Sequence, residues 1–185
     1  LNGAVHGVFW REAYKYINNA NAVIEGLSKS TSLSGSTRTQ LEGEAKFIRA
    51  FCHFYLVNLF GDIPYVTTTD YQKNSTSVRL NATEVYTKII SDLTDAKNLL
   101  ATDYSFSNGE RSQPNRFAAI ALLARVYLYT GKWAEAEAEA SAIIDNTVDF
   151  ELEELDNVFL STSKEAIWQL QPVVPEKSTA QARIF

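Results

Sequence analysis

Cysteine and methionine are almost absent from this sequence of 185 residues, which contains one cysteine and no methionine. A single thiol, Cys52, forms neither an internal disulfide nor a metal cluster, so we expect it to be a small core residue. No run of about 18 apolar residues occurs, so the sequence contains no candidate transmembrane helix. Because it also lacks an initiating methionine and a signal peptide, we interpret it as a piece of a longer chain.

Motifs of common catalytic and metal sites are also missing. The sequence has two histidines, His6 and His53, but no HExxH, GxSxG or CxxC motif and no glycine-rich phosphate loop. Paired carboxylates can hydrolyse glycosides, but the acidic residues here suit helix surfaces and ends. We therefore predict a protein that is not an enzyme and holds no metal or cofactor. The net charge of −5 argues against nucleic acid as a partner.

Apolar residues recur at three- and four-residue spacing through most of the sequence, which predicts helices. The expected helices cover 7–27, 36–60, 81–100, 114–130 and 133–146. Ser36 is the expected N-cap of the second, and Asn81 with Glu84 resembles a capping box at the start of the third. Pro114 suits an early position in the fourth. The sequence therefore predicts an all-α fold.

The stretch GEAKFIRAFCHFYLVNLFGDIPYV, residues 43–66, is rich in aromatic residues and contains an arginine. Its apolar residues cover well over half of the helix circumference, which predicts a helix packed on several sides. Gly61 and Pro64 end this helix, and Asp62 is expected to accept backbone donors in the turn. For Arg49, an ion pair or carbonyl contact between stacked helices is favoured over the binding of an anionic sugar.

The last two expected helices fit the tetratricopeptide pattern in part. Leu123, Ala124 and Tyr127 have the first-helix spacing, Gly131 and Trp133 take the turn positions, and Ala136 takes the small position of the second helix. Ala140 replaces the usual aromatic residue, so a plain helical hairpin remains an alternative. One repeat cannot bury its own face, so further helices are expected to stack on it.

The pattern changes after Asn146. In EAIWQLQP, Ala166, Trp168 and Leu170 alternate with other residues, which predicts a short β element over 166–171. Residues 65–80 are polar and rich in turn formers, so an extended loop is expected there. We interpret residues 1–185 as one partial domain, with a helical-repeat region at about 5–146 and a mixed segment at 147–185.

These blocks, in this order, closely resemble the SusD/RagB family of cell-surface, glycan-capturing lipoproteins of Bacteroidetes. Residues 43–66 resemble the signature helix of the family, and WREAYKYINNANAVIEGL and EVYTKIISDLTDAKNLL resemble the helices on either side of it. RFAAIALLARVYLYTGKWAEAEAEASAII resembles the tetratricopeptide hairpin, and EAIWQLQ the segment that follows. The resemblance covers almost all of this sequence but only the amino-terminal, tetratricopeptide-like part of a family member.

The resemblance implies a non-catalytic lipoprotein at the outer membrane that binds an oligosaccharide or polysaccharide. It also implies delivery of that ligand to a SusC-like TonB-dependent transporter, held largely through the helical-repeat side. It further implies that the membrane is reached only through a lipid anchor outside this sequence. The alternative from another class is a tetratricopeptide-type scaffold for protein interactions, without a sugar ligand.

Candidate glycan-binding residues follow from the chemistry of sugars. Oligosaccharides present flat C–H faces and many hydroxyls, which match an exposed aromatic ring with polar residues at its edge. Most aromatic residues here lie on helix stripes and are expected in the core. The loop aromatics are therefore the candidates: Tyr65, Tyr71, Tyr104 and Phe106. Gln72, Lys73 and Asn74 provide a polar edge beside Tyr71.

Overall fold

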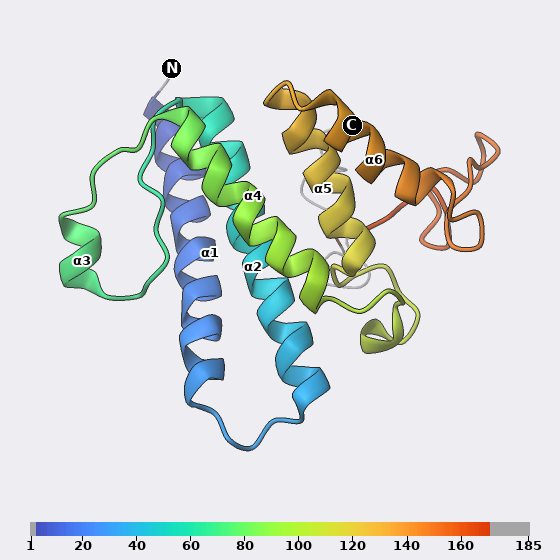
Figure 1. Ribbon diagram of the computed structural model, residues 1–185, viewed down its shortest axis with the longest axis horizontal. Helices are drawn as coiled ribbons and strands as arrows, with labels where there is room; N and C mark the ends of the chain where they lie inside the picture. Colours follow the sequence, from blue (N-terminus) through green and yellow to red (C-terminus); the bar gives the residue numbers. More distant parts are fainter. Residues whose placement is uncertain (1–2, 171–185) are drawn as a thin grey trace.

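The computed structural model describes residues 3–170, where the regular secondary structure is helical (Figure 1). The helices are α1 (Gly3–Lys29), α2 (Gly35–Phe60), α3 (Tyr71–Ser75), α4 (Ala82–Leu99), the 3-10 helix η1 (Ser105–Ser107), α5 (Arg116–Tyr129) and α6 (Trp133–Ile144). The long helices pack in the order α1, α2, α4, α5, α6. The all-α prediction is confirmed, and the stacking is consistent with a tetratricopeptide-like arrangement.

Helix α2 lies inside the stack, with α1 and α4 packed against it. Its most buried apolar residues are at most 4% exposed: Phe47, Ala50, Phe54, Leu56 and Val57. Fully burying a side chain such as Phe or Leu contributes about 1.5–3 kcal/mol each. Much of the apolar surface of residues 43–66 is therefore core, although Tyr55 and Leu59, on the predicted stripe, are 42% and 47% exposed.

Local capping sets the starts of α2, α4 and α5 within two residues of the predicted positions, whereas α1 begins at Gly3, four residues before its predicted start. Ser34, rather than Ser36, is the N-cap of α2, and its hydroxyl accepts the amide of Thr37 at 3.2 Å. Asn81 caps α4 as predicted, accepting the amide of Glu84 at 3.0 Å. Helix α5 begins at Arg116 with Asn115 as its cap, so Pro114 lies just before the helix. Sequence patterns locate these helices well, but the exact cap depends on local geometry.

Gly43 marks the closest approach of α2 to the end of α4. A Cβ built at this position would lie 2.8 Å from Cγ of Leu100 and 3.1 Å from Cβ of Leu99. Both distances are shorter than ordinary carbon–carbon contacts, so no side chain fits without movement of the neighbours.

Gly43→Ala is expected to destabilise the protein by about 1 kcal/mol, because an overpacking cost of about 1–3 kcal/mol exceeds the helix-propensity gain of about 0.5–1 kcal/mol. Gly26→Ala is the matched control, because its new methyl meets nothing within 4 Å. The control is expected to stabilise by about 0.5–1 kcal/mol. Urea unfolding measures both variants, and equal stabilisation by the two would contradict the close contact.

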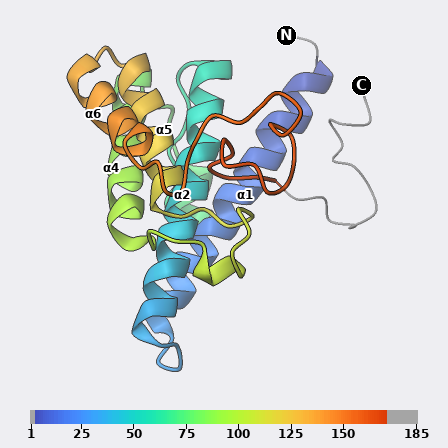
Figure 2. The ribbon, with the colours of Figure 1, turned by 90° about the vertical axis from the view of Figure 1, so that its right-hand side faces the viewer.

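The predicted β element over 166–171 is wrong for its described part, since residues 166–170 form bends and irregular backbone. No neighbouring strand offers a ladder to this segment within residues 3–170, and alternation alone cannot supply one. The segment instead turns back across α2 (Figure 2), where the ring of Trp168 lies edge-to-face with Phe47 and Phe51. One backbone bond, from the amide of Gln169 to the carbonyl of Arg111 at 2.8 Å, holds it. Residue 171 lies outside the described residues.

Candidate functional site

A buried ion pair joins α2 to α4 at the centre of the stack. Nε of Arg49 donates to one carboxylate oxygen of Asp92 at 2.7 Å and its Nη2 donates to the other at 2.6 Å. Nη1 of Arg49 donates to the side-chain oxygen of Asn21 on α1 at 2.9 Å. The side chains of the ion pair are only 8% and 9% exposed. Arg49 therefore links three helices, which is the structural role favoured from the sequence.

His53 continues this polar network toward the segment after α2. Its Nε2 accepts the amide of Val66 at 3.2 Å, so Nδ1 carries the proton and donates to the carbonyl of Arg49 at 2.8 Å. Burial lowers the pKa of His53 to about 4, so the ring is neutral near pH 7. The ring of Tyr65 stacks on His53 at 3.8 Å, and its hydroxyl donates to Asp92 at 2.6 Å.

Helix α1 holds the same segment from its other side. The hydroxyl of Tyr14 donates to the carbonyl of Pro64 at 2.7 Å. The amide of Asn21 donates to the carbonyls of Val66 and Thr68 at 3.2 and 3.3 Å. These bonds satisfy carbonyls that have no partner in a sheet or helix.

Glu25, further along α1, receives the next residues of the segment. Its carboxylate accepts the amide of Thr69 at 2.9 Å and the hydroxyl of Thr68 at 2.8 Å. Hydrogen bonds from Thr69 and then Thr68 lower the pKa of Glu25 to about 2. Residues 64–69 are therefore fixed by side chains of α1, α2 and α4.

The turn after α2 also positions the start of α4. Gly61 has a φ of +70°, which favours glycine. The carboxylate of Asp62 accepts the amide of Ala82, the first residue of α4, at 3.1 Å. The predicted role of Asp62 is correct in kind, because it accepts a backbone donor. The donor, however, comes from a distant residue rather than from the turn before Pro64.

Helix α3 follows this fixed segment and projects from the helical stack beside α1 (Figure 1). Asp70 caps it, with its carboxylate accepting the amides of Gln72 and Lys73 at 2.9 and 3.3 Å. The side chain of Tyr71 is 81% exposed. We call residues 64–80 the α3 loop. It carries an exposed aromatic ring, and its first residues, 64–69, are held in place by three helices.

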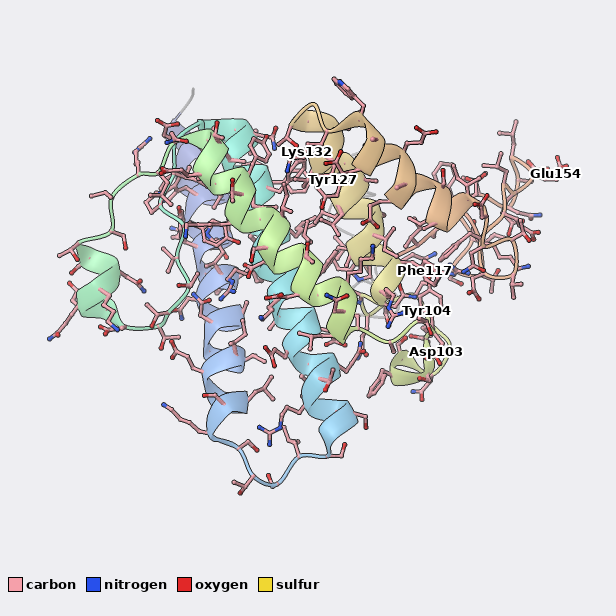
Figure 3. The ribbon with its side chains drawn as sticks, in the orientation of Figure 1. Asp103, Tyr104, Phe117, Tyr127, Lys132 and Glu154 are labelled. Carbon is pink, nitrogen blue, oxygen red and sulfur yellow. The ribbon has the colours of Figure 1, made fainter. Side chains whose placement is uncertain are left out.

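Tyr104 and Phe106 lie in the second loop, which joins α4 to α5. The hydroxyl of Tyr104 donates to the carbonyl of Ile167 at 2.9 Å, and the guanidinium of Arg111 lies 4.7 Å from the centre of its ring. Phe106 is 41% exposed. Tyr104 lies on the opposite side of the α1–α2–α4 stack from α3 (Figures 1 and 3).

The structure thus places the four candidate aromatics in three different surroundings. Tyr65 is packed into the polar network, Tyr71 is open to solvent on the α3 loop, and Tyr104 and Phe106 belong to the second loop. Between residues 3 and 170, no cluster of His, Cys, Asp and Glu has the arrangement of a metal site. No helix in that range combines the length and apolarity needed to cross a membrane.

Sequence reasoning missed the partners of Arg49. Asn21 lies four residues after Ile17 on the buried stripe of α1, and Asp92 lies three residues after Ile89 on that of α4. The sequence did contain a signal for both partners: each is a polar residue within an apolar helical stripe. A polar side chain at such a position is buried and therefore needs a buried hydrogen-bond partner. Glu25, at an intermediate position, gives no comparable signal.

Comparison with known proteins decides the family. Residues 3–128 match the profile of a protein family described as "Starch-binding associating with outer membrane". This chain belongs to the SusD-like family. Its resemblance to SusD/RagB proteins is thereby confirmed. The SusD-like family comprises non-catalytic carbohydrate-binding proteins.

Individual SusD-like proteins show how much of a family member is present. The chain is 37% identical over 153 residues to the SusD-like protein P2 of Formosa agariphila, which covers 82% of this chain and 29% of that protein. A SusD superfamily structure from Parabacteroides distasonis has a TM-score of 0.84 at 27% identity, covering 96% and 40%. A laminarin-binding SusD-like structure has a TM-score of 0.73 at 26% identity, covering 83% and 35%. This chain therefore spans less than half of each of these three relatives.

Proposed function

We propose that the protein containing this chain captures oligosaccharides at the bacterial cell surface and delivers them to a SusC-like TonB-dependent transporter. A lipid anchor outside the described residues would hold it at the outer membrane. The match of residues 3–128 to a starch-binding, outer-membrane-associated family carries this proposal. The laminarin-binding relative supports a glycan ligand, because it shares this fold.

Within this chain, the α3 loop offers the surface best suited to a sugar. The ring of Tyr71 is free to stack on the C–H face of a pyranose, and the exposed side chains of Gln72 and Lys73 can bind hydroxyls at its edge. The amide of Asn74 already donates to the carbonyl of Thr68 at 2.8 Å, so it contributes mainly to the shape of the loop. A rigid base beneath an exposed ring lowers the entropic cost of binding.

In this proposal the other candidate aromatics support the site or contact the ligand only secondarily. Tyr65 presents neither its hydroxyl nor the face stacked on His53, so we assign it to holding the loop in place. Phe106 is the more accessible aromatic of the second loop, and Tyr104 positions it by bonding to Ile167. Because the second loop and the α3 loop lie on opposite sides of the helical stack, only a glycan long enough to reach from one to the other can contact both.

Tyr71→Ala is expected to weaken glycan binding roughly tenfold, since it removes the stacking surface. Calorimetric titration of the full chain with maltooligosaccharides and laminarin oligosaccharides measures the effect. Tyr16→Ala is the matched control, because Tyr16 is 53% exposed but lies on α1 and makes no described contact with the α3 loop. If the two variants bound the glycan with equal affinity, Tyr71 would not be part of the binding site.

The tetratricopeptide-type scaffold remains the competing function. A groove between α5 and α6 is lined by Leu128, Tyr129 and Trp133, among others. The scaffold function predicts no heat of binding with any glycan, together with saturable binding of a peptide in this groove. That combination would replace the glycan-capture proposal.

A further inference from the structure

No other helix that the structure describes lies in contact with α3. None of the five residues of α3 is buried, and Figure 1 shows the helix standing away from α1. Its position is therefore not set by apolar packing, which fixes the long helices of the stack. The groups that orient the exposed ring of Tyr71 must act through the two ends of the α3 loop.

Residues 70–78 hold one another within the α3 loop. Asp70 caps α3, and the side-chain amide of Asn74 donates to the carbonyl of Thr68 at 2.8 Å. Every hydrogen bond described for residues 70–78 has its other partner within residues 68–78. They therefore form one unit, whose orientation depends on where the unit is attached to the helical stack.

The second end of the loop is attached to the turn after α2. The amide of Leu80 donates to the carbonyl of Ile63 at 3.0 Å, and Nη1 of Arg79 donates to the carbonyl of Asp62 at 3.1 Å. These bonds close the neck of the loop beyond the end of α3. They do not reach α3 itself, so they leave its orientation to the first end of the loop.

The first end of the loop is attached through the carboxylate of Glu25. This carboxylate accepts the amide of Thr69 at 2.9 Å, the hydroxyl of Thr68 at 2.8 Å and also the hydroxyl of Thr69. Asn21 holds the carbonyl of Thr68 as well, but Glu25 is the one partner described for Thr69 outside the loop. Since Thr69 lies two residues before Tyr71, Glu25 makes the last contact between the helical stack and the chain that leads to the exposed ring.

Glu25 differs from the buried ion pair in its surroundings. It is partly exposed near the end of α1, and its partners, Thr68 and Thr69, lie outside the apolar core. Loss of its carboxylate therefore leaves the packing of the long helices in place while it frees the residues that lead into α3. A ligand must then order these residues itself, which weakens binding.

We propose that Glu25 is a positioning residue for glycan binding, which holds α3 in the orientation in which the ring of Tyr71 meets the sugar. The inference rests on the proposed function and adds a residue that acts through Tyr71 without contacting the ligand. Three hydrogen bonds already occupy the carboxylate, out of roughly four acceptor sites, so its effect on a sugar is indirect.

Glu25→Ala is expected to weaken the binding of maltooligosaccharides or laminarin oligosaccharides about fivefold in calorimetric titration, because α3 loses its fixed orientation. Glu25→Gln keeps one acceptor oxygen and is expected to lose about twofold. The urea unfolding midpoints of both variants should stay close to that of the unaltered chain. Glu12→Ala is the matched control, because it removes the same charge from α1, where the carboxylate bonds to Arg11 and Lys15.

Combination with Tyr71→Ala tests whether Glu25 acts through the ring. Once the ring is absent, its orientation no longer matters. The double variant is therefore expected to bind about as weakly as Tyr71→Ala alone, roughly tenfold below the unaltered chain, instead of the roughly fiftyfold expected of independent effects. Amide hydrogen exchange of residues 66–74 is expected to rise in Glu25→Ala and to stay unchanged in Glu12→Ala.

The results distinguish this inference from the proposed function. Glycan binding that Glu25→Ala retains in full, or loses equally with Glu12→Ala, would overturn the inference and leave glycan capture intact. Multiplied losses in the double variant, or an unfolding midpoint that falls together with the affinity, would also overturn it, because Glu25 would then act by another route than Tyr71. Absence of glycan binding by the unaltered chain would overturn the proposed function and this inference together.

Discussion

Arg49→Met is expected to lower the free energy of unfolding by about 3–5 kcal/mol, the cost typical of breaking a buried ion pair. The substitution keeps much of the apolar stem but leaves the Asp92 carboxylate at 9% exposure without its cation. It also removes the donor to the side chain of Asn21. Denaturant unfolding measures the change.

A double substitution separates two contributions to stability: the cost of leaving the Asp92 carboxylate unpaired, and the net stabilisation by the ion pair itself. Arg49→Met/Asp92→Leu removes both charges, and replacing a buried pair by apolar residues is often close to neutral. We expect the double variant to recover at least half of the lost stability. The remainder is due to the unpaired amide oxygen of Asn21 and to the Tyr65 hydroxyl, which keeps only its longer bond to the carbonyl of Lys88 at 3.3 Å. A loss under about 1 kcal/mol in Arg49→Met would contradict the proposed importance of the network.

Acidification is expected to destabilise the protein through His53. Its pKa is about 4 in the folded state, against an ordinary value of 6.5, because burial disfavours the charged ring. Between pH 6.5 and 4 the unfolded state binds a proton that the folded state does not. Stability therefore falls as the pH drops through this window, by roughly 3 kcal/mol in total.

The geometry explains why the proton is excluded. A second ring proton on His53 would face the amide of Val66, which also donates, and the Arg49 guanidinium opposes the added charge. Urea unfolding at several pH values compares the full chain with His53→Gln. The variant is expected to be less stable at pH 7 but to lose this part of the slope, because other titrating groups are unchanged. If the unfolding free energy of the variant changed with pH as steeply as that of the unaltered chain, groups other than His53 would cause the pH dependence.

The helices were predictable because each depends on local information. Periodicity located the five long helices, and Asn81, Gly61 and Gly131 marked caps and turns that the structure contains. The interpretation of residues 166–170 as a strand failed because a strand requires a partner, which alternation in one segment cannot reveal. Cap positions moved by two residues because several serines and threonines compete at the start of α2.

The candidate site was only partly predictable for a related reason. The sequence indicated that Arg49 was structural, but not that Asn21 and Asp92 would receive it, since both contacts join residues far apart in the chain. It likewise grouped Tyr65 with Tyr71 as loop aromatics. The packing distinguishes them, because only Tyr65 lies against a buried histidine and carboxylate.

The polar network gives residues 43–66 a structural role in positioning the α3 loop. The helix itself presents no reactive group to a ligand. Its histidine accepts the amide of Val66, and its arginine binds Asn21 and Asp92. Asn21 and Asp92 in turn bond to residues 65, 66 and 68, which lead into α3 and the exposed ring of Tyr71. Damage to the network is therefore expected to weaken glycan binding as well as stability.

The most direct measurement of the central claim is a calorimetric titration of the full chain with a panel of neutral oligosaccharides, including starch-derived and laminarin-derived glycans. Glycan capture predicts saturable binding of at least one of them, weakened by Tyr71→Ala. The absence of binding to every glycan in the panel, with the protein folded, would contradict it.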